Sequence, residues 1–142
     1  MNYSVRYEKS CGLLLFRNHL VLLLHYPRGH WDFPKGHINA NETEHETACR
    51  ELHEETAIKE ISLVDGFRGV SEYDFRRERV LYRKKVIYFI ATTLEDQVVL
   101  SDEHQGFEWM PLGKAYQRLT FENSRSLLTR AEKHLLTHKL IT

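Results

Sequence analysis

The chain has 142 residues, enough for one domain with a sizeable core and too few for two comfortable ones. Its hydrophobic content of 42% and charged content of 28% are typical of a soluble globular protein, and exclude a disordered, fibrous or membrane chain. The 20 basic and 20 acidic residues balance, so no general attraction to nucleic acid or to an anionic membrane is expected. Any phosphate-binding site must therefore be local.

The cysteines and the N-terminus favour a reducing, cytoplasmic setting. Cys11 and Cys49 each lie inside a predicted regular element, and nothing in their spacing resembles a disulfide framework. No charged segment followed by a long apolar stretch is present, because the apolar runs 13–16 and 20–24 are interrupted by the polar residues 17–19. We therefore expect neither secretion nor a membrane span.

The N-terminal part of the chain predicts strands separated by turns. Runs 13–16 and 20–24 have strand length and are joined by a tight polar link, so they are predicted to form a hairpin. Glycine and proline then break regularity, and residues 29–37 are predicted to be a short extended segment that ends in a loop.

The rest of the chain predicts helices at both ends of a strand-rich region. Residues 42–56 lack glycine and proline, and Asn41 or Thr43 can cap a helix there. Helical spacing of apolar residues predicts two further helices, at 112–119 and 124–138. Between them, β-branched and aromatic residues predict strands at 61–64, 66–73, 82–92, 98–100 and 107–110. Since no repeat or linker divides the chain, we expect one mixed α/β domain spanning residues 1–142.

Three glutamates gather on one face of the first helix. Glu51, Glu54 and Glu55 stand at offsets of zero, three and four, so at about 100° per residue they share that face. Such like charges repel one another unless a cation or basic partner offsets them. Magnesium prefers oxygen ligands and often bridges carboxylates to substrate phosphates. The alternative is an ordinary solvated charged face.

The residues before and around these glutamates distinguish a metal site from an ordinary charged face. Gly36 is followed after five residues by Glu42, and after seven more by Arg-Glu-Leu-His-Glu-Glu-Thr-Ala-Ile at 50–58. Residues 36–58 resemble the Nudix signature at every defined position except Ala57, where that family has glycine. A glycine there lets the chain leave the helix in a left-handed conformation, so alanine implies some strain or a different exit.

The resemblance implies the Nudix fold, an α/β/α sandwich with a mixed central sheet and the Nudix loop-helix. It implies a Mg²⁺ cofactor, with Mn²⁺ as the alternative ion. The implied metal ligands are the carbonyl of Gly36 and the carboxylates of Glu51, Glu54, Glu55 and Glu103. It further implies that one of Glu54, Glu55 and Glu103 acts as catalytic base, and that Glu42 and Arg50 brace the loop and helix.

Residues outside the box resemble the asymmetrical diadenosine tetraphosphate hydrolases of the same superfamily. The segments that carry this resemblance are 11–16, 30–37, Lys84 with 86–89, and 101–104 with Trp109. By this resemblance Lys35, His37 and Lys84 are expected to bind phosphate. Lys85 replaces Lys84 if the strand register differs by one, since neighbouring strand residues point to opposite faces.

Adenine requires flat apolar surfaces, and stacking on an aromatic ring contributes on the order of 1–3 kcal/mol per base. By the same resemblance Tyr73 and Phe121 are expected to sandwich a base, with Tyr82 and Tyr88 as alternatives. Simple core packing remains a second explanation for any one of these rings.

The expected activity is hydrolysis of diadenosine tetraphosphate to ATP and AMP, by in-line attack of metal-activated water without a covalent intermediate. The expected partner is thus a small dinucleoside polyphosphate, and neither a membrane nor a long nucleic acid. A second hypothesis for the function is removal of pyrophosphate from 5′ ends of RNA. The balanced charge of the chain argues against this hypothesis. A non-catalytic nucleotide sensor is the third, and intact Glu51, Glu54 and Glu55 count against it. The oligomeric state stays open.

Overall fold

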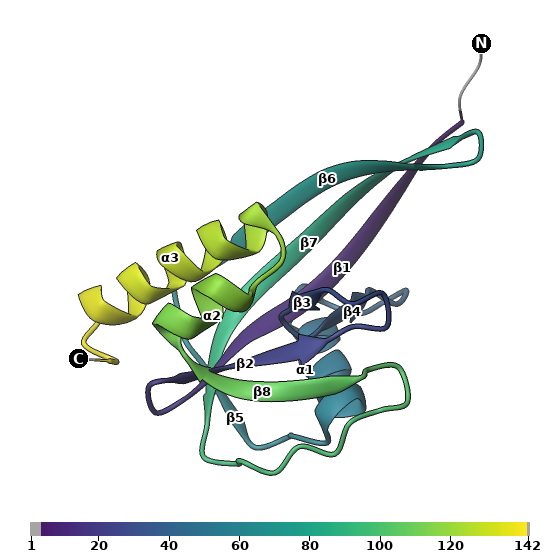
Figure 1. Ribbon diagram of the computed structural model, residues 1–142. Coiled ribbons are helices and arrows are strands. Elements are labelled where there is room, and N and C mark those ends of the chain that lie inside the picture. The colour runs from purple at the N-terminus through teal and green to yellow at the C-terminus, as the bar shows by residue number, and fades with distance from the viewer. Residues whose placement is uncertain (1–3, 142) are drawn as a thin grey trace.

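The computed structural model describes residues 4–141, which form eight strands and three helices (Figure 1). The strands are β1 (Ser4–Arg17), β2 (Leu20–His25), β3 (Trp31–Asp32), β4 (Lys35–His37), β5 (Ile61–Leu63), β6 (Gly69–Arg77), β7 (Val80–Thr93) and β8 (Gly106–Pro111). The helices are α1 (Glu44–Thr56), α2 (Leu112–Arg118) and α3 (Glu122–Thr137), each within two residues of its predicted ends. None of these described helices is long and apolar enough to cross a membrane.

The strands form one mixed sheet centred on β1 and β7. These two strands run parallel, from Ser4 beside Val80 to Phe16 beside Thr92. The other pairings are antiparallel, with β2 and β4 on β1, β5 and β6 on β7, and β3 and β8 on β2. The C-terminal end of β1 pairs with β2 to form the predicted N-terminal hairpin. The mixed sheet confirms the α/β expectation.

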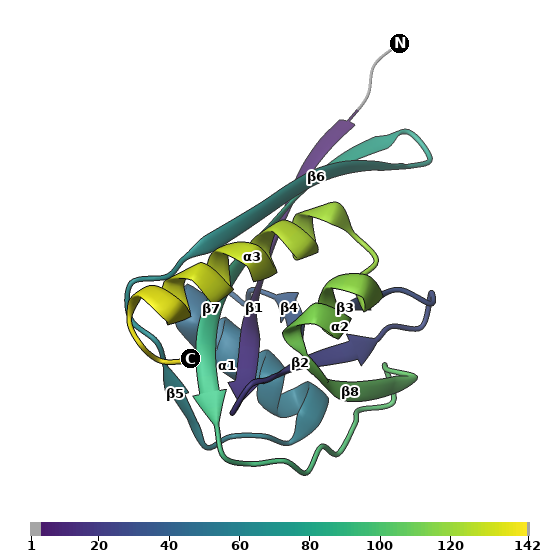
Figure 2. The ribbon, with the colours of Figure 1, turned by 60° about the vertical axis from the view of Figure 1, so that its left-hand side comes forward.

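Helices cover both faces of this sheet (Figure 2). Because successive strand residues point to opposite faces, alternate residues of β1 and β7 build two separate cores. The core under α2 and α3 contains Leu14, Phe16, Val86, Tyr88 and Ile90. The core under α1 contains Cys11, Leu13, Leu15, Ile87 and Phe89. The result is the α/β/α sandwich that the resemblance implied.

Both ends of α1 are determined by particular residues. Thr43, and not Asn41, is the N-cap, and its hydroxyl accepts from the Glu46 amide while the Glu46 carboxylate accepts from the Thr43 amide. At the other end Ala57 takes the left-handed conformation, with φ 66°, and donates to the carbonyl of His53. Alanine thus makes the same exit as glycine, at a cost of roughly 1–2 kcal/mol in backbone strain.

The predicted strand at 98–100 was wrong, because this segment pairs with no strand among the described residues. Its backbone is instead tied to the end of α1, where the Val99 amide donates to the Thr56 carbonyl and the Ser101 amide to the Glu55 carbonyl. These two backbone hydrogen bonds hold the loop at 101–104 against the helix.

Candidate active site

A cleft of about 580 Å³ opens between α1, β4, β7 and the loop that precedes β8. Eight of the residues that the sequence analysis singled out line it. They are Lys35, Gly36 and His37 on β4, Glu51, Glu54 and Glu55 on α1, Lys84 on β7, and Glu103 in the loop. Acidic and basic side chains therefore share one cavity.

Gly36 lets α1 lie directly against β4. Its backbone pairs with Cys11 of β1, and the carboxylate of Glu51 occupies the space where a side chain at position 36 would stand. A Cβ atom on Gly36 would collide with that carboxylate. Any other residue there would displace Glu51 or separate the helix from the strand.

The guanidinium of Arg50 connects the loop before α1 to the cleft carboxylates. Its Nε lies 2.6 Å from the carboxylate of Glu42, and its Nη1 donates to Glu51 at 2.9 Å and to Glu54 at 3.1 Å. Its Nη2 donates to the carbonyl of His37 at 2.9 Å. The hydrogen bond from Arg50 is the main reason that the pKa of Glu42 falls to about 2. One cation thus holds the β4 end and two glutamates of α1 together.

Glu55 is the most enclosed carboxylate of the cleft, with only 3% of its surface exposed. It accepts from the backbone amide of Lys35 at 3.1 Å, and its other oxygen lies 2.8 Å from Nε2 of His104. Burial raises the pKa of Glu55, although the hydrogen bond from His104 opposes the rise. Burial also raises the pKa of Glu51. The surrounding protein groups therefore do not fully stabilise the ionised carboxylates of Glu51 and Glu55.

The donor groups of the cleft fit a hard divalent cation. One potential ligand atom from each of Glu55, Glu103 and His104 lies within 4.8 Å of the others. Carboxylate oxygens dominate the cleft, and they are the ligands that Mg²⁺ and Mn²⁺ prefer. A cation here would stabilise the ionised form of carboxylates that burial disfavours.

His104 was not predicted from the sequence. Its side chain is almost fully enclosed, the ring of Tyr26 meets it edge-on at 4.6 Å between centroids, and Nδ1 has no hydrogen-bond partner within residues 4–141. Its position beside Glu103 in a polar loop was the only available signal. The bond to Glu55 depends on the loop being tied to α1, which no local pattern predicts.

Strand alternation selects Lys84 over Lys85, as expected from the register. Lys84 lines the cleft, its Nζ lies 3.0 Å from Nε2 of His37, and the carboxylate of Glu8 is 3.6 Å away. Burial lowers the pKa of Lys84. Lys85 points to the opposite face and lies 3.8 Å from Glu72. Only one of the two lysines can therefore meet a phosphate in the cleft.

The arrangement of a strand glycine packed against a glutamate-rich helix has a counterpart in a known family. Residues 6–131 match the family model described as the NUDIX domain. The chain belongs to the Nudix family. The segment 36–58, with Ala57 in place of glycine, is therefore its Nudix box.

Within the Nudix family the chain is similar to asymmetrical bis(5′-nucleosyl)-tetraphosphatases. It is 36% identical to that of Rattus norvegicus, over 89% of this chain and 95% of the relative. It is 31% identical to that of Caenorhabditis elegans, over 84% and 91%. A crystal structure of a C. elegans Ap4A hydrolase binary complex superposes with a TM-score of 0.83 and 29% identity, covering 92% of this chain and 98% of that one.

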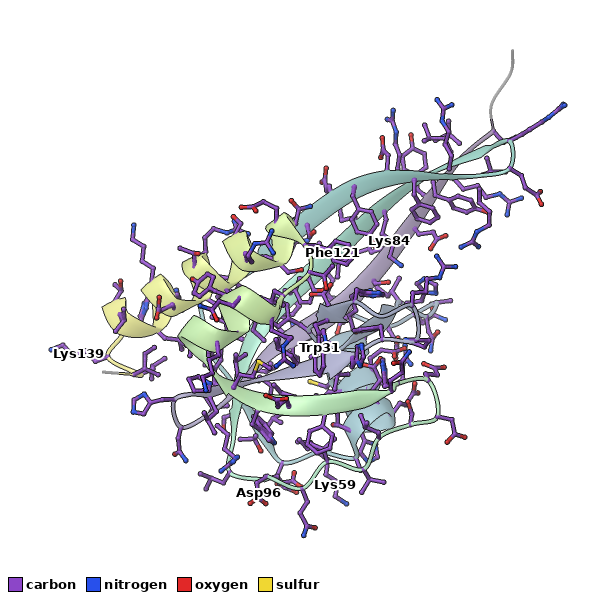
Figure 3. The ribbon with its side chains drawn as sticks, viewed as in Figure 1. Trp31, Lys59, Lys84, Asp96, Phe121 and Lys139 are labelled. Atoms are coloured by element: carbon purple, nitrogen blue, oxygen red, sulfur yellow. The ribbon has the colours of Figure 1, made fainter. Side chains whose placement is uncertain are left out.

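The two aromatic residues expected to bind adenine lie beside the Nudix cleft and do not line it. Tyr73 pairs with Lys84 across β6 and β7, so both side chains point to the same face of the sheet. The amide of Asn123 donates to the Glu72 carbonyl, which places the start of α3, and with it Phe121, near Tyr73. Figure 3 labels Lys84 and Phe121 in this region.

Exposure separates the aromatic candidates. Tyr73 is 43% exposed and Phe121 is 47% exposed, so both offer a ring face to a ligand. Tyr88 is only 2% exposed and packs edge-on against Phe33 in the core, which removes it as an alternative. His30, which was not predicted, tilts against Phe121 with 5.3 Å between centroids.

Proposed function

We propose that this Nudix protein hydrolyses dinucleoside polyphosphates and cleaves diadenosine tetraphosphate asymmetrically, to ATP and AMP. The proposal is carried by the gathering of the box glutamates and three basic side chains in one cleft. Similarity to asymmetrical tetraphosphatases over nearly the whole of both chains supports this choice of substrate. A small cleft that combines basic side chains with carboxylates able to hold a cation suits a compact polyphosphate.

The proposed cofactor is Mg²⁺, with Mn²⁺ as the alternative. The ligands would be the Gly36 carbonyl and the carboxylates of Glu51, Glu54, Glu55 and Glu103. Such a cation, when bound, neutralises charge on phosphate oxygens and makes a bound water easier to deprotonate. Arg50 keeps Glu51 and Glu54 facing the cleft by hydrogen bonds to both.

The catalytic base is proposed to be Glu54, Glu55 or Glu103, which differ in how firmly they are held. Glu55 is fixed by the Lys35 amide and by His104, so it can hold a proton or a ligand at a defined position. The side chain of Glu54 is 55% exposed and hydrogen-bonded by Arg50, which leaves it freer to move. Attack by water in line with the leaving phosphate needs no covalent intermediate.

Phosphate binding is proposed for Lys35, His37 and Lys84. Lys84 is already close to His37. The carboxylate of Glu8 lies 3.6 Å from Nζ of Lys84 and 3.2 Å from Nε2 of His37. A polyphosphate would replace the single carboxylate of Glu8 as the partner of these side chains with several oxygens. The half-exposed rings of Tyr73 and Phe121 are proposed to stack on adenine beside this site.

We further propose a cytoplasmic setting and a single domain over residues 1–142. Cys11 and Cys49 are both free thiols, which suits a reducing compartment. Both hydrophobic cores share one sheet, so no boundary divides the described chain.

Product analysis tests the activity. The protein is incubated with Mg²⁺ and diadenosine tetraphosphate, beside a 5′-triphosphorylated RNA, and products are separated by ion-exchange chromatography. Equal ATP and AMP are expected, with turnover reduced at least about 100-fold in Glu55→Gln and unchanged in Glu60→Gln, which removes an exposed carboxylate outside the cleft. Two ADP would contradict asymmetric cleavage, products from RNA alone would favour the RNA pyrophosphohydrolase, and binding without products would favour the sensor.

A further inference from the structure

Three strands continue past the helices as a projecting arm (Figure 1). We define the arm as residues 4–8 of β1, 73–77 of β6 and 80–84 of β7. Helix α3 reaches the base of the arm, where Asn123 contacts the backbone of Glu72, and the ribbon shows no helix over the rest of the part that the structure describes. The arm therefore presents both sheet faces to solvent.

One face of the arm is continuous with the cleft. Since directly paired strand residues point to the same side, the register places successive rows of side chains on the face that carries Lys84. The rows, moving outward, are Tyr73, Lys84 and Glu8, then Phe75, Tyr82 and Arg6, then Arg77, Val80 and Ser4. Each row lies about 7 Å beyond the previous one. A path of aromatic and basic side chains thus leads away from the phosphate-binding end of the cleft.

The rings on this face form a series in which the outer pair is stacked and the inner contact is tilted. Phe75 and Tyr82 are parallel, with 4.9 Å between centroids and 6° between planes, and Tyr73 follows with 6.3 Å to Phe75. The guanidinium of Arg77 lies 5.8 Å from each centroid of the outer pair. Cross-strand ring pairs stabilise a sheet, but here Tyr73 is exposed and Phe75 and Tyr82 are only half-buried, so part of the ring surface beside Arg77 still reaches the solvent.

Charge on the arm is positive, although the whole chain is balanced. The arm together with its β6–β7 turn, residues 4–8 and 73–84, contains three acidic residues and six basic ones. The acidic residues are Glu8, Asp74 and Glu78, and the basic ones are Arg6, Arg76, Arg77, Arg79, Arg83 and Lys84. These segments are far apart in sequence and are brought together by the parallel pairing of β1 with β7. The tertiary structure thus builds a local positive field that whole-chain composition does not reveal.

We propose that the cleft-side face of the arm binds single-stranded nucleic acid, with a 5′-phosphorylated end directed to the cleft. Unpaired bases would stack on Tyr73, Phe75 and Tyr82, while Arg6 and Arg77 bind the backbone phosphates. An acidic peptide would use the arginines but not the flat rings, and a duplex would offer no free base. This surface goes beyond the proposed hydrolysis of a dinucleotide, whose contacts end at the base of the arm.

Fluorescence anisotropy with a 3′-labelled, unstructured 12-nucleotide RNA tests the proposal, at low salt and without divalent cation so that nothing is hydrolysed. Arg77→Gln with Arg6→Gln should weaken binding about tenfold and reduce the salt slope by roughly 0.7 per arginine removed. Arg83→Gln with Arg76→Gln is the matched control, since it removes the same two charges from the opposite face of the same arm. It should change binding less than about twofold.

The rings of Phe75 and Tyr82 are tested by substitutions other than alanine, because alanine there would destabilise the pairing of β6 with β7. Phe75→Leu and Tyr82→Leu keep an apolar side chain but remove the flat face, and should each weaken binding several-fold in variants that thermal melting shows to be folded at the assay temperature. Hydrolysis of diadenosine tetraphosphate should be unaffected by Arg77→Gln. Equal losses of binding in the two double variants, equal affinity for single strand and duplex, or association with phosphatidylserine vesicles in place of RNA would each overturn the proposal.

Discussion

Nε2 of His104 lies 2.8 Å from Oε2 of Glu55, across a sequence separation of 49 residues. Both side chains are nearly inaccessible to solvent, at 2% and 4% exposed. The bond exists because the loop at 101–104 is tied to the end of α1 through the backbone of Ser101. It connects a group outside the Nudix box to a carboxylate within it.

His104 is expected to act as a positioning residue for Glu55. Partners that orient ligand side chains usually contribute about 10–100-fold to activity or metal affinity. His104→Leu should therefore lower kcat by that amount with little change in KM, while His104→Gln, which keeps an N–H donor, should recover part of it. Steady-state kinetics with both variants decide the matter. Equal activity of wild type and His104→Leu would show that the bond has no role.

Substitution of Gly36 should disrupt the contact between β4 and α1. Gly36→Ala places a methyl group into the carboxylate of Glu51, which must swing away, so we expect loss of most activity. Because that carboxylate is the far end of a flexible side chain, we expect destabilisation of only about 1 kcal/mol or less. Urea denaturation and activity assays measure the two effects. Gly113→Ala in α2 is the control, since a Cβ there meets nothing within 4 Å and should stabilise the helix by about 0.5–1 kcal/mol.

Ala57→Gly should increase stability. The residue has φ 66°, and glycine adopts this conformation without the strain that a side chain brings. The larger backbone entropy of glycine in the unfolded chain offsets part of the gain, so a net rise of about 0.5–1 kcal/mol is expected by urea denaturation. Ala40→Gly, in an exposed turn, should give no such rise. A decrease in Ala57→Gly would show that the left-handed alanine is not strained.

Stability should fall in acid through Glu44. Hydrogen bonds from Arg68, supported by Lys9 at 2.7 Å, hold the pKa of Glu44 at about 2, below its ordinary 4.5. Because the folded-state pKa is the lower one, the contribution is complete above about pH 4.5 and is lost as the pH falls towards 2. Glu44→Gln should flatten the stability profile in that window. If the Glu44→Gln and wild-type curves stay parallel from pH 5 to 2, the ion pair contributes nothing.

Divalent cation should stabilise the fold as well as enable turnover. At ten times its dissociation constant, Mg²⁺ should raise Tm by about 4 °C, because it binds the folded cleft and relieves repulsion among the carboxylates. Glu51→Gln should reduce this shift, and chelator should reverse it. Differential scanning calorimetry at constant ionic strength measures the effect, with sodium chloride as the control. The same shift in Glu51→Gln would place the cation elsewhere.

Several features of the site could be read from the sequence because they depend on geometry within one element. The helical repeat puts Glu51, Glu54 and Glu55 on one side of α1, and all three line the cleft. Strand alternation separates Lys84 from Lys85 in the same way. The one wrong strand, at 98–100, shows the limit of composition, since that segment bonds to the end of a helix and not to a neighbouring strand.

The sequence by itself determined the family, the three helices and the carboxylate face, since each is encoded by residues close together in the chain. Only the tertiary structure decided that His104 supports Glu55 and that Arg6 joins Phe75 and Tyr82 on one face of the arm. Such contacts depend on which strands pair and in which register. Local periodicity does not encode strand pairing or register, because burial and hydrogen bonding across the whole sheet determine them.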